Sequence, residues 1–191
     1  MHVQTIGAFE KEIGSPSKRT LQKITETLEA AGVEFLPDDD GVRRSSGKVR
    51  HFQGRTGFKN FMDDVYEVTR TQGGEICLHN AKPSNWIKWL GESYVSAYTE
   101  RMLALGDIDV RITVHHGEYQ LVSKHAEYRW LPSEFWNDQS FYAYGDRIAL
   151  LNFEEDSVQI VVIHNRKFAD GFRNLFNVTW NSVAVIPDKQ P

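Results

Sequence analysis

Hydrophobic positions from residue 58 onward predict helices and strands in alternation. A stripe at helical spacing ends at Gly73-Gly74, and two more helices are expected over residues 84–105, capped by Ser84, and 167–180. Apolar runs predict strands at residues 75–79, 109–114, 141–153 and 157–163, with weaker candidates at 119–122 and 127–131. This order predicts an α/β fold, a mixed sheet with helices on both faces.

The first 57 residues carry a different pattern, which predicts two short helices and a hairpin. Residues 3–12 form an apolar stripe that Gly14-Ser15-Pro16 breaks, and Ser17 can cap a second helix that ends before Gly32. Residues 33–36 and 42–44 alternate as short strands around a Pro-Asp-Asp-Asp-Gly turn. We therefore expect two helices in 1–36, a hairpin and basic linker in 37–57, and an α/β domain in 58–185.

The length of 191 residues fits one medium domain with a small appendage. The longest apolar runs are far shorter than the roughly 20 residues that a membrane span needs. Cys77 is the single cysteine, so it has no partner for an internal disulfide. These features predict a cytoplasmic protein that does not contact a membrane.

Charge is spread unevenly along the chain, although its formal net value is only −4. Residues 1–55 hold nine basic and eight acidic side chains, whereas residues 56–191 hold 13 and 18. The segment from Gly41 to Arg55 contains five basic residues and no acid. This local charge suits either an arm that contacts phosphates or a solvated linker.

Three short runs near the N-terminus form one pattern: VQTIGAFE at residues 3–10, TLQKI at 20–24 and LEAAGVEF at 28–35. Together they resemble the second half of a phage-repressor-type helix-turn-helix domain. The resemblance implies a recognition helix at the start of the chain, with these DNA contacts: His2, Gln4, Thr5, Lys11, Arg43 and Arg44.

Two further helices precede and brace the recognition helix in that family. We therefore expect the chain as written to bind DNA weakly by itself. Three explanations stay open: a start codon set too far downstream, a trimmed chain, or a gene that kept only its second domain.

A second pattern lies in the C-terminal part: FYAYGDRIALL at residues 141–151, VQIVVI at 158–163 and FADGFRNLF at 168–176, then Trp180. It resembles the closing part of a phospholipase D-like domain, and the resemblance extends over residues 49–183. Catalysis in that superfamily uses a His-x-Lys-x(4)-Asp motif with a histidine nucleophile. The corresponding positions here are Asp138, Ser140 and Gly145, so the resemblance predicts a domain that is not an enzyme.

The histidines offer a few other candidate sites. His79, Asn80 and Lys82 follow a predicted strand, and ligands of α/β sheets gather at the carboxyl ends of strands, so these three residues are expected to line a ligand pocket. His115 and His116 are adjacent on a strand and face opposite sides, so they cannot share a metal ion. We expect no metal site and no cofactor.

Aromatic side chains are dense between residues 128 and 144. Phospholipase D-like domains pair about a two-fold axis, which favours a homodimer interface here. The residues expected in it are Trp130, Phe135, Trp136 and Tyr142.

These features support a DNA-binding transcriptional regulator, or a truncated form of one, with a dimerising and catalytically inactive phospholipase D-like domain. This hypothesis also includes a small-molecule effector as a partner of the protein. The alternative is a nuclease or phosphodiesterase with a non-standard site built from His79, Lys82, His115 or His164. A protein–protein assembly module is the second alternative.

Overall fold

The computed structural model describes residues 17–30, 33–35, 42–44 and 49–188. The chain forms two units, residues 1–47 and 48–191. In the first unit, helix α2 (Lys18–Ala30) precedes a hairpin of β1 (Val33–Phe35) and β2 (Val42–Arg44), which pair antiparallel. The Ser17 hydroxyl accepts a hydrogen bond from the Thr20 amide (3.2 Å), so Ser17 caps the helix as predicted.

The second unit is built on a seven-stranded sheet with the order β3-β9-β8-β7-β4-β5-β6. The strands are β3 (Val49–Gln53), β4 (Glu75–Ala81), β5 (Asp109–His115), β6 (Glu127–Leu131), β7 (Ser140–Tyr144), β8 (Arg147–Phe153) and β9 (Val158–His164). Strands β4, β5 and β6 run parallel, and the other neighbours pair antiparallel.

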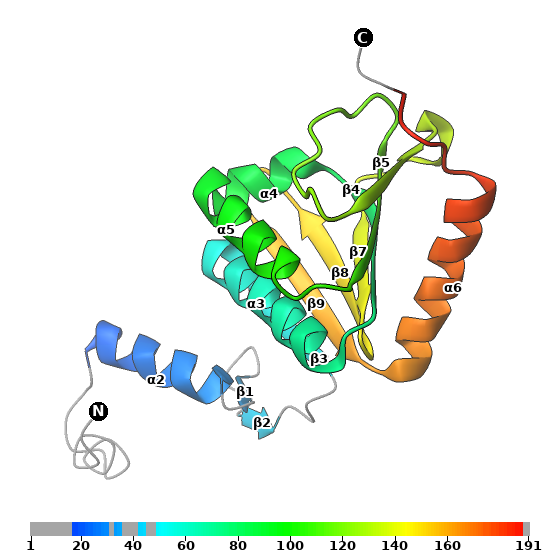
Figure 1. Ribbon diagram of the computed structural model, residues 1–191. Coiled ribbons are helices and arrows are strands. Elements are labelled where there is room, and N and C mark those ends of the chain that lie inside the picture. Colours follow the sequence, from blue (N-terminus) through cyan, green and yellow to red (C-terminus); the bar gives the residue numbers. More distant parts are fainter. Residues whose placement is uncertain (1–16, 31–32, 36–41, 45–48, 189–191) are drawn as a thin grey trace. The chain divides into compact units, whose positions relative to one another are not determined.

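Helices cover both faces of this sheet (Figure 1). On one face lie α3 (Gly54–Gln72), α4 (Pro83–Leu90) and α5 (Glu92–Leu103), and on the other lies α6 (Arg166–Ser182). The predicted fold class is therefore confirmed. Within the part of the chain that the structure describes, no helix is both long and apolar enough to cross a membrane.

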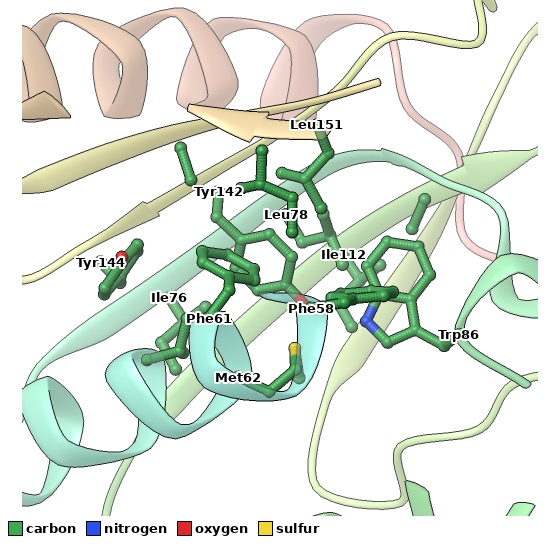
Figure 2. Packing of buried hydrophobic residues seen from close by; sticks show 14 of the residues in the cluster. Phe58, Phe61, Met62, Ile76, Leu78, Trp86, Ile112, Tyr142, Tyr144 and Leu151 are labelled. Atoms are coloured by element: carbon green, nitrogen blue, oxygen red, sulfur yellow. The ribbon is translucent and has the colours of Figure 1, made fainter. Parts of the chain in front are cut away.

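The larger core lies between the sheet and α3, α4 and α5, and Figure 2 shows part of it. Its aromatic rings meet edge to face: Phe58 lies 5.6 Å from Trp86, and Phe61 lies 5.4 Å from Tyr142, between ring centroids. A smaller core under α6 contains Cys77, Phe176 and Trp180. Burial raises the pKa of the Cys77 thiol to about 12, so it stays protonated at neutral pH.

The structure differs from the predicted elements at four places. Residues 49–53 form β3 and α3 begins at Gly54, so the segment predicted as linker belongs to the second unit from Lys48 onward. The long helix predicted over 84–105 divides at Gly91, which has a φ of 85°, and its first part begins at Pro83 with Lys82 at the N-cap, so the predicted Ser84 cap is wrong. The strand predicted over 141–153 is a hairpin that turns at Gly145-Asp146, and residues 119–122 form no strand.

The predicted dimer interface needs correction for two residues. Trp130 is 2% exposed and Tyr142 is 6% exposed, because both pack in the larger core. Neither can supply surface to a partner. Phe135 is 55% exposed and Trp136 is partly buried, so these two alone of the four have surface to offer.

The turn between β7 and β8 is fixed by its packing against α3. Gly145 has a φ of 50°, and a Cβ added there would lie 2.4 Å from the Cγ1 atom of Val68. Asp146 pairs with His164 on β9, and Arg147 pairs with Asp64 on α3. The Gly-Asp-Arg sequence that contributed to the phospholipase D resemblance is thus explained here by contacts that hold the fold together.

Gly145→Ala is expected to lower the free energy of unfolding by about 2–4 kcal/mol, since it adds a left-handed alanine and a steric overlap. Urea denaturation measures the change. Gly171→Ala is the matched control, because Gly171 is helical and its added Cβ meets nothing within 4 Å. This control should stabilise by up to about 1 kcal/mol, and equal effects of the two substitutions would contradict the packing argument.

Candidate functional site

Polar side chains converge at the end of the sheet where strands β4 and β5 finish and β7 begins. This end of the strands is called the His79 edge. His79 lies near the carboxyl end of β4 and pairs in register with Phe141 of β7. Thr113 lies on the neighbouring strand β5, and its Oγ1 is 3.0 Å from the Nδ1 atom of His79. The same Oγ1 atom accepts a hydrogen bond from the Asn80 amide (3.0 Å). Thr113 is fully buried, so it holds both groups in place.

The backbone at Asn80 is strained in the way that functional sites often are. Asn80 has a φ of 54°, and the register of β4 with β5 shifts between Leu78 and Ala81. The Asn80 side-chain amide donates to the Asn137 Oδ1 atom (3.0 Å) and to the Gln139 carbonyl (3.3 Å). Its own Oδ1 atom is buried and has no hydrogen-bond partner among the described residues.

A second histidine lies at the same edge. His115 is the last residue of β5, two residues beyond Thr113, so the alternation of a strand places both on the face of α6. Its Nε2 atom is 3.2 Å from the Ser133 Oγ, and its ring meets Trp136 edge to face at 5.3 Å. His79 is held similarly, stacked on Phe141 at 5.0 Å. Each ring therefore has a fixed orientation and a hydroxyl at one nitrogen.

Burial sets the charge of His79. Because the ring is largely removed from water, the pKa of His79 falls to about 4. The imidazole is thus neutral at pH 7, and a neutral imidazole retains a lone pair that can attack an electrophile.

This pKa predicts a loss of stability in mild acid. The unfolded chain takes up a proton on His79 near pH 6.5, whereas the folded chain does so near pH 4. Above pH 6.5 the free energy of unfolding therefore does not depend on the protonation of His79. It falls by on the order of 2–3 kcal/mol as the pH falls from 6.5 to 4. Urea denaturation at several pH values should show a shallower decline for His79→Asn than for the native chain, and identical declines would contradict this assignment.

Two of the three positions that correspond to the phospholipase D motif, Asp138 and Ser140, lie at this same edge, whereas Gly145 lies in the turn at the other end of β7. Ser140, at the lysine position, is 4% exposed and donates its hydroxyl to the Asn80 carbonyl (2.7 Å). Asp138, at the histidine position, is exposed just before β7. The chain contains no His-x-Lys sequence anywhere. Other polar groups therefore occupy the place of the motif, next to His79.

The remaining predicted residues fall in several places. Lys82 is exposed and forms the N-cap position of α4, directly after β4. His164 pairs with Asp146 at the far end of the sheet, away from His79 in register. His2, Gln4, Thr5 and Lys11 lie outside the described residues, and only the backbone of Arg43 and Arg44 is described, in β2. No cluster of three or more His, Cys, Asp or Glu side chains that could hold a metal occurs in the described ranges.

Comparison with known proteins gives structural likeness only. The chain matches no protein family and no curated protein by sequence. NucT from Helicobacter pylori superposes with a TM-score of 0.52 at 9% identity, over 73% of this chain and 99% of NucT. Nuc from Salmonella typhimurium, a phospholipase D family member, gives a TM-score of 0.49 at 14% identity, over 73% of this chain and 98% of Nuc.

A third neighbour is TrmBL2, an archaeal chromatin protein whose structure shows a novel mode of DNA binding. It gives a TM-score of 0.47 at 15% identity, and this chain, aligned over 96% of its residues, spans 66% of the length of TrmBL2. The likeness to NucT shows that the second unit has this α/β fold.

The prediction that the chain is not an enzyme is contradicted by the likeness to NucT. That prediction was drawn from the missing His-x-Lys-x(4)-Asp motif. A missing motif removes one arrangement of catalytic side chains, whereas the edge of the sheet that would carry it holds two oriented histidines instead.

Proposed function

We propose that the second unit hydrolyses phosphodiester bonds of nucleic acid at the sheet edge formed by β4, β5 and β7, with His79 as the nucleophile. The observation that carries the proposal is the neutral His79 ring, held by Thr113 close to Ser140, which stands at the lysine position of the phospholipase D motif. This proposal corresponds to the alternative drawn from the sequence, a nuclease or phosphodiesterase with a non-standard site.

The chemistry requires one group to attack and another to protonate the leaving strand. With its proton on Nδ1 and directed at Thr113, His79 presents the Nε2 lone pair to the phosphorus. The phosphorus–oxygen bond of the leaving strand then breaks, and His115 gives that oxygen a proton. Water next attacks the phosphorus and gives a proton to His115, and the phosphorus–nitrogen bond breaks. Both histidines are restored, and the product carries a phosphomonoester end.

Charge near the site suits an anionic substrate. Lys82 and the amides of α4 that come after Pro83, which has no N–H, follow β4, and both supply positive potential to a phosphate. In this role Lys82 is a binding residue and Thr113 is a positioning residue, because Thr113 acts through the His79 ring.

The experiment is a turnover assay with end-labelled single-stranded and duplex DNA and with a chromogenic phosphodiester, with and without divalent metal. We expect cleavage of at least one of these substrates. Because the His79 pKa is about 4, the acidic limb of kcat/KM should lie near pH 4 and not near 6.5. No turnover on any of the three substrates would reject the proposal.

A DNA-binding regulator is the second candidate, and the specific observation in its favour is the helix-turn-helix resemblance of residues 3–35. In this candidate the first unit binds an operator, and the second unit forms a homodimer through exposed residues such as Phe135. Arg43 and Arg44 contact phosphates, so the Arg43→Ala/Arg44→Ala double variant should reduce the slope of log affinity against log salt by about 2. Gel-shift titration of the full natural protein measures that slope, and an unchanged slope would contradict the assignment of these two arginines.

A further inference from the structure

A cavity of about 50 Å³ lies on the face of the sheet opposite α6, whereas the His79 ring packs on the α6 side. Ile76, Leu78 and Ile112 form its floor on the sheet, and Trp86, Leu90 and Met102 form its wall on α4 and α5. A single water needs about 10–15 Å³ of such space, so this cavity can hold a compact organic molecule. Val122, Ser123 and His125, from the segment between β5 and β6, line its remaining side.

Two residues that line this apolar cavity each have a buried polar atom without a described partner. Thr99 is 6% exposed, and its Oγ1 atom makes no hydrogen bond to any described residue. The Nδ1 atom of His125 is also buried without a described partner. An unsatisfied buried polar group costs about 1–3 kcal/mol, so two of them around one cavity need an explanation.

Other helical threonines show how unusual Thr99 is. Thr69 is equally buried on α3 and donates its hydroxyl to the Val65 carbonyl one turn earlier (2.8 Å). Thr71 and Thr179 make the same bond to the carbonyls four residues before them. Thr99 has no such bond, although the carbonyl of Val95 is at the same position in α5. The Thr99 hydroxyl therefore does not donate to a carbonyl of its own helix and is free to bind another group.

We propose that this cavity binds a small, uncharged and mostly apolar molecule, such as a substituted aromatic ring, whose single polar group hydrogen-bonds to Thr99 Oγ1 and His125 Nδ1. The described lining contains no Asp, Glu, Lys or Arg side chain, so a charged ligand would lose its hydration without gaining a partner. Burial also lowers the pKa of His125, which keeps this ring neutral near pH 7. The site is separate from the His79 edge, and its ligand differs in chemistry from a nucleic acid.

Phenol and benzene are matched probes, because they share a ring and differ by one hydroxyl. Titration calorimetry on the whole chain should show saturable phenol binding, with benzene about tenfold weaker, the effect of one neutral hydrogen bond. In Thr99→Val, phenol affinity should fall severalfold toward the level of benzene, because only His125 is left to bond the hydroxyl, while benzene affinity is unchanged. Absence of saturable phenol binding to the native chain, or equal affinities for the two probes, would overturn the proposal.

Thermal unfolding without a probe supplies an independent test. Thr99→Val removes an unsatisfied hydroxyl, so its Tm should equal or exceed that of the native chain. Thr69→Val is the matched control, and its Tm should fall because it loses the bond to Val65. If Thr99→Val lowers the Tm as much as Thr69→Val does, the Thr99 hydroxyl is satisfied within the protein and the proposed anchor is wrong.

Discussion

Replacing His79 by Asn is expected to reduce phosphodiester turnover by at least about a thousandfold, because the variant lacks the imidazole that attacks the phosphorus, and His115 is assigned to the leaving strand. The substitution keeps a polar side chain of similar size that can still hydrogen-bond to Thr113. The fold should therefore survive, which circular dichroism and the Tm verify. Initial rates on the substrate that the native chain cleaves best measure the effect.

Two further variants separate chemistry from general damage. His51→Asn is the matched control, since His51 is exposed on edge strand β3, and its turnover should stay within about twofold of native. Thr113→Val should lower kcat more than it raises KM, because it removes the partner that orients the ring and leaves the substrate contacts in place. Equal losses for His79→Asn and His51→Asn would show that His79 has no special role.

Asp64→Asn is expected to lower the free energy of unfolding by about 3–5 kcal/mol, the effect of breaking a buried ion pair from one side. The Asp64 carboxylate, 11% exposed, lies 2.5 Å from the Arg147 guanidinium and 2.5 Å from that of Arg50. The Tyr144 hydroxyl donates a third hydrogen bond to it (2.9 Å). This one side chain of α3 therefore ties together β3, β7 and β8, and an amide there leaves Arg147 with only its longer contact to the Asp146 carboxylate (3.8 Å).

The neighbouring Asp63 provides the control for this prediction. Its carboxylate is 51% exposed and pairs with Arg101, which is 43% exposed, so Asp63→Asn should cost less than about 1 kcal/mol. Urea denaturation of both variants at pH 7 gives the comparison. Similar losses from the two substitutions would contradict the structural role of Asp64.

The pH dependence of Asp64 provides a second check. Burial alone would raise the pKa of Asp64, but hydrogen bonds and charge from Arg147, with smaller effects of Tyr144 and Arg50, hold it below its ordinary value of 3.8. The stability from this carboxylate is therefore complete above pH 3.8 and is lost only below it, in more acidic solution than the loss from His79.

The sequence pattern predicted the elements in which hydrophobic positions repeat regularly. It missed an element in which only one side chain is buried. The helical stripe of α3 and the apolar strand β9 were identified because many positions repeat, whereas β7 and β8 were predicted as one strand. In β3 only Phe52 is buried, and an edge strand with one inward side chain gives no alternation to detect. Trp130 and Tyr142 were expected at a surface because composition alone does not distinguish core aromatic residues from interface residues.

The candidate site was predicted in part. His79 and Asn80 were identified by their position after a strand, and the structure places them at the sheet edge expected for a ligand. Thr113 and Ser140 were missed, because their roles depend on which strands are neighbours, and periodicity does not give strand order. Knowing that β5 lies beside β4 would have placed Thr113 next to His79 by register. The cavity at Thr99 arises from packing among three helices and the sheet, for which the sequence carries no local signal.

The covalent step at His79 is the central claim, and mass spectrometry of the rapidly quenched reaction tests it most directly. The account predicts a phosphoryl adduct on the peptide that contains His79, stable in base and lost in acid as a phosphorus–nitrogen bond is. The adduct should be absent from His79→Asn and present in His51→Asn. Turnover with an adduct on another residue, or with no adduct in a quenched burst, would contradict the account.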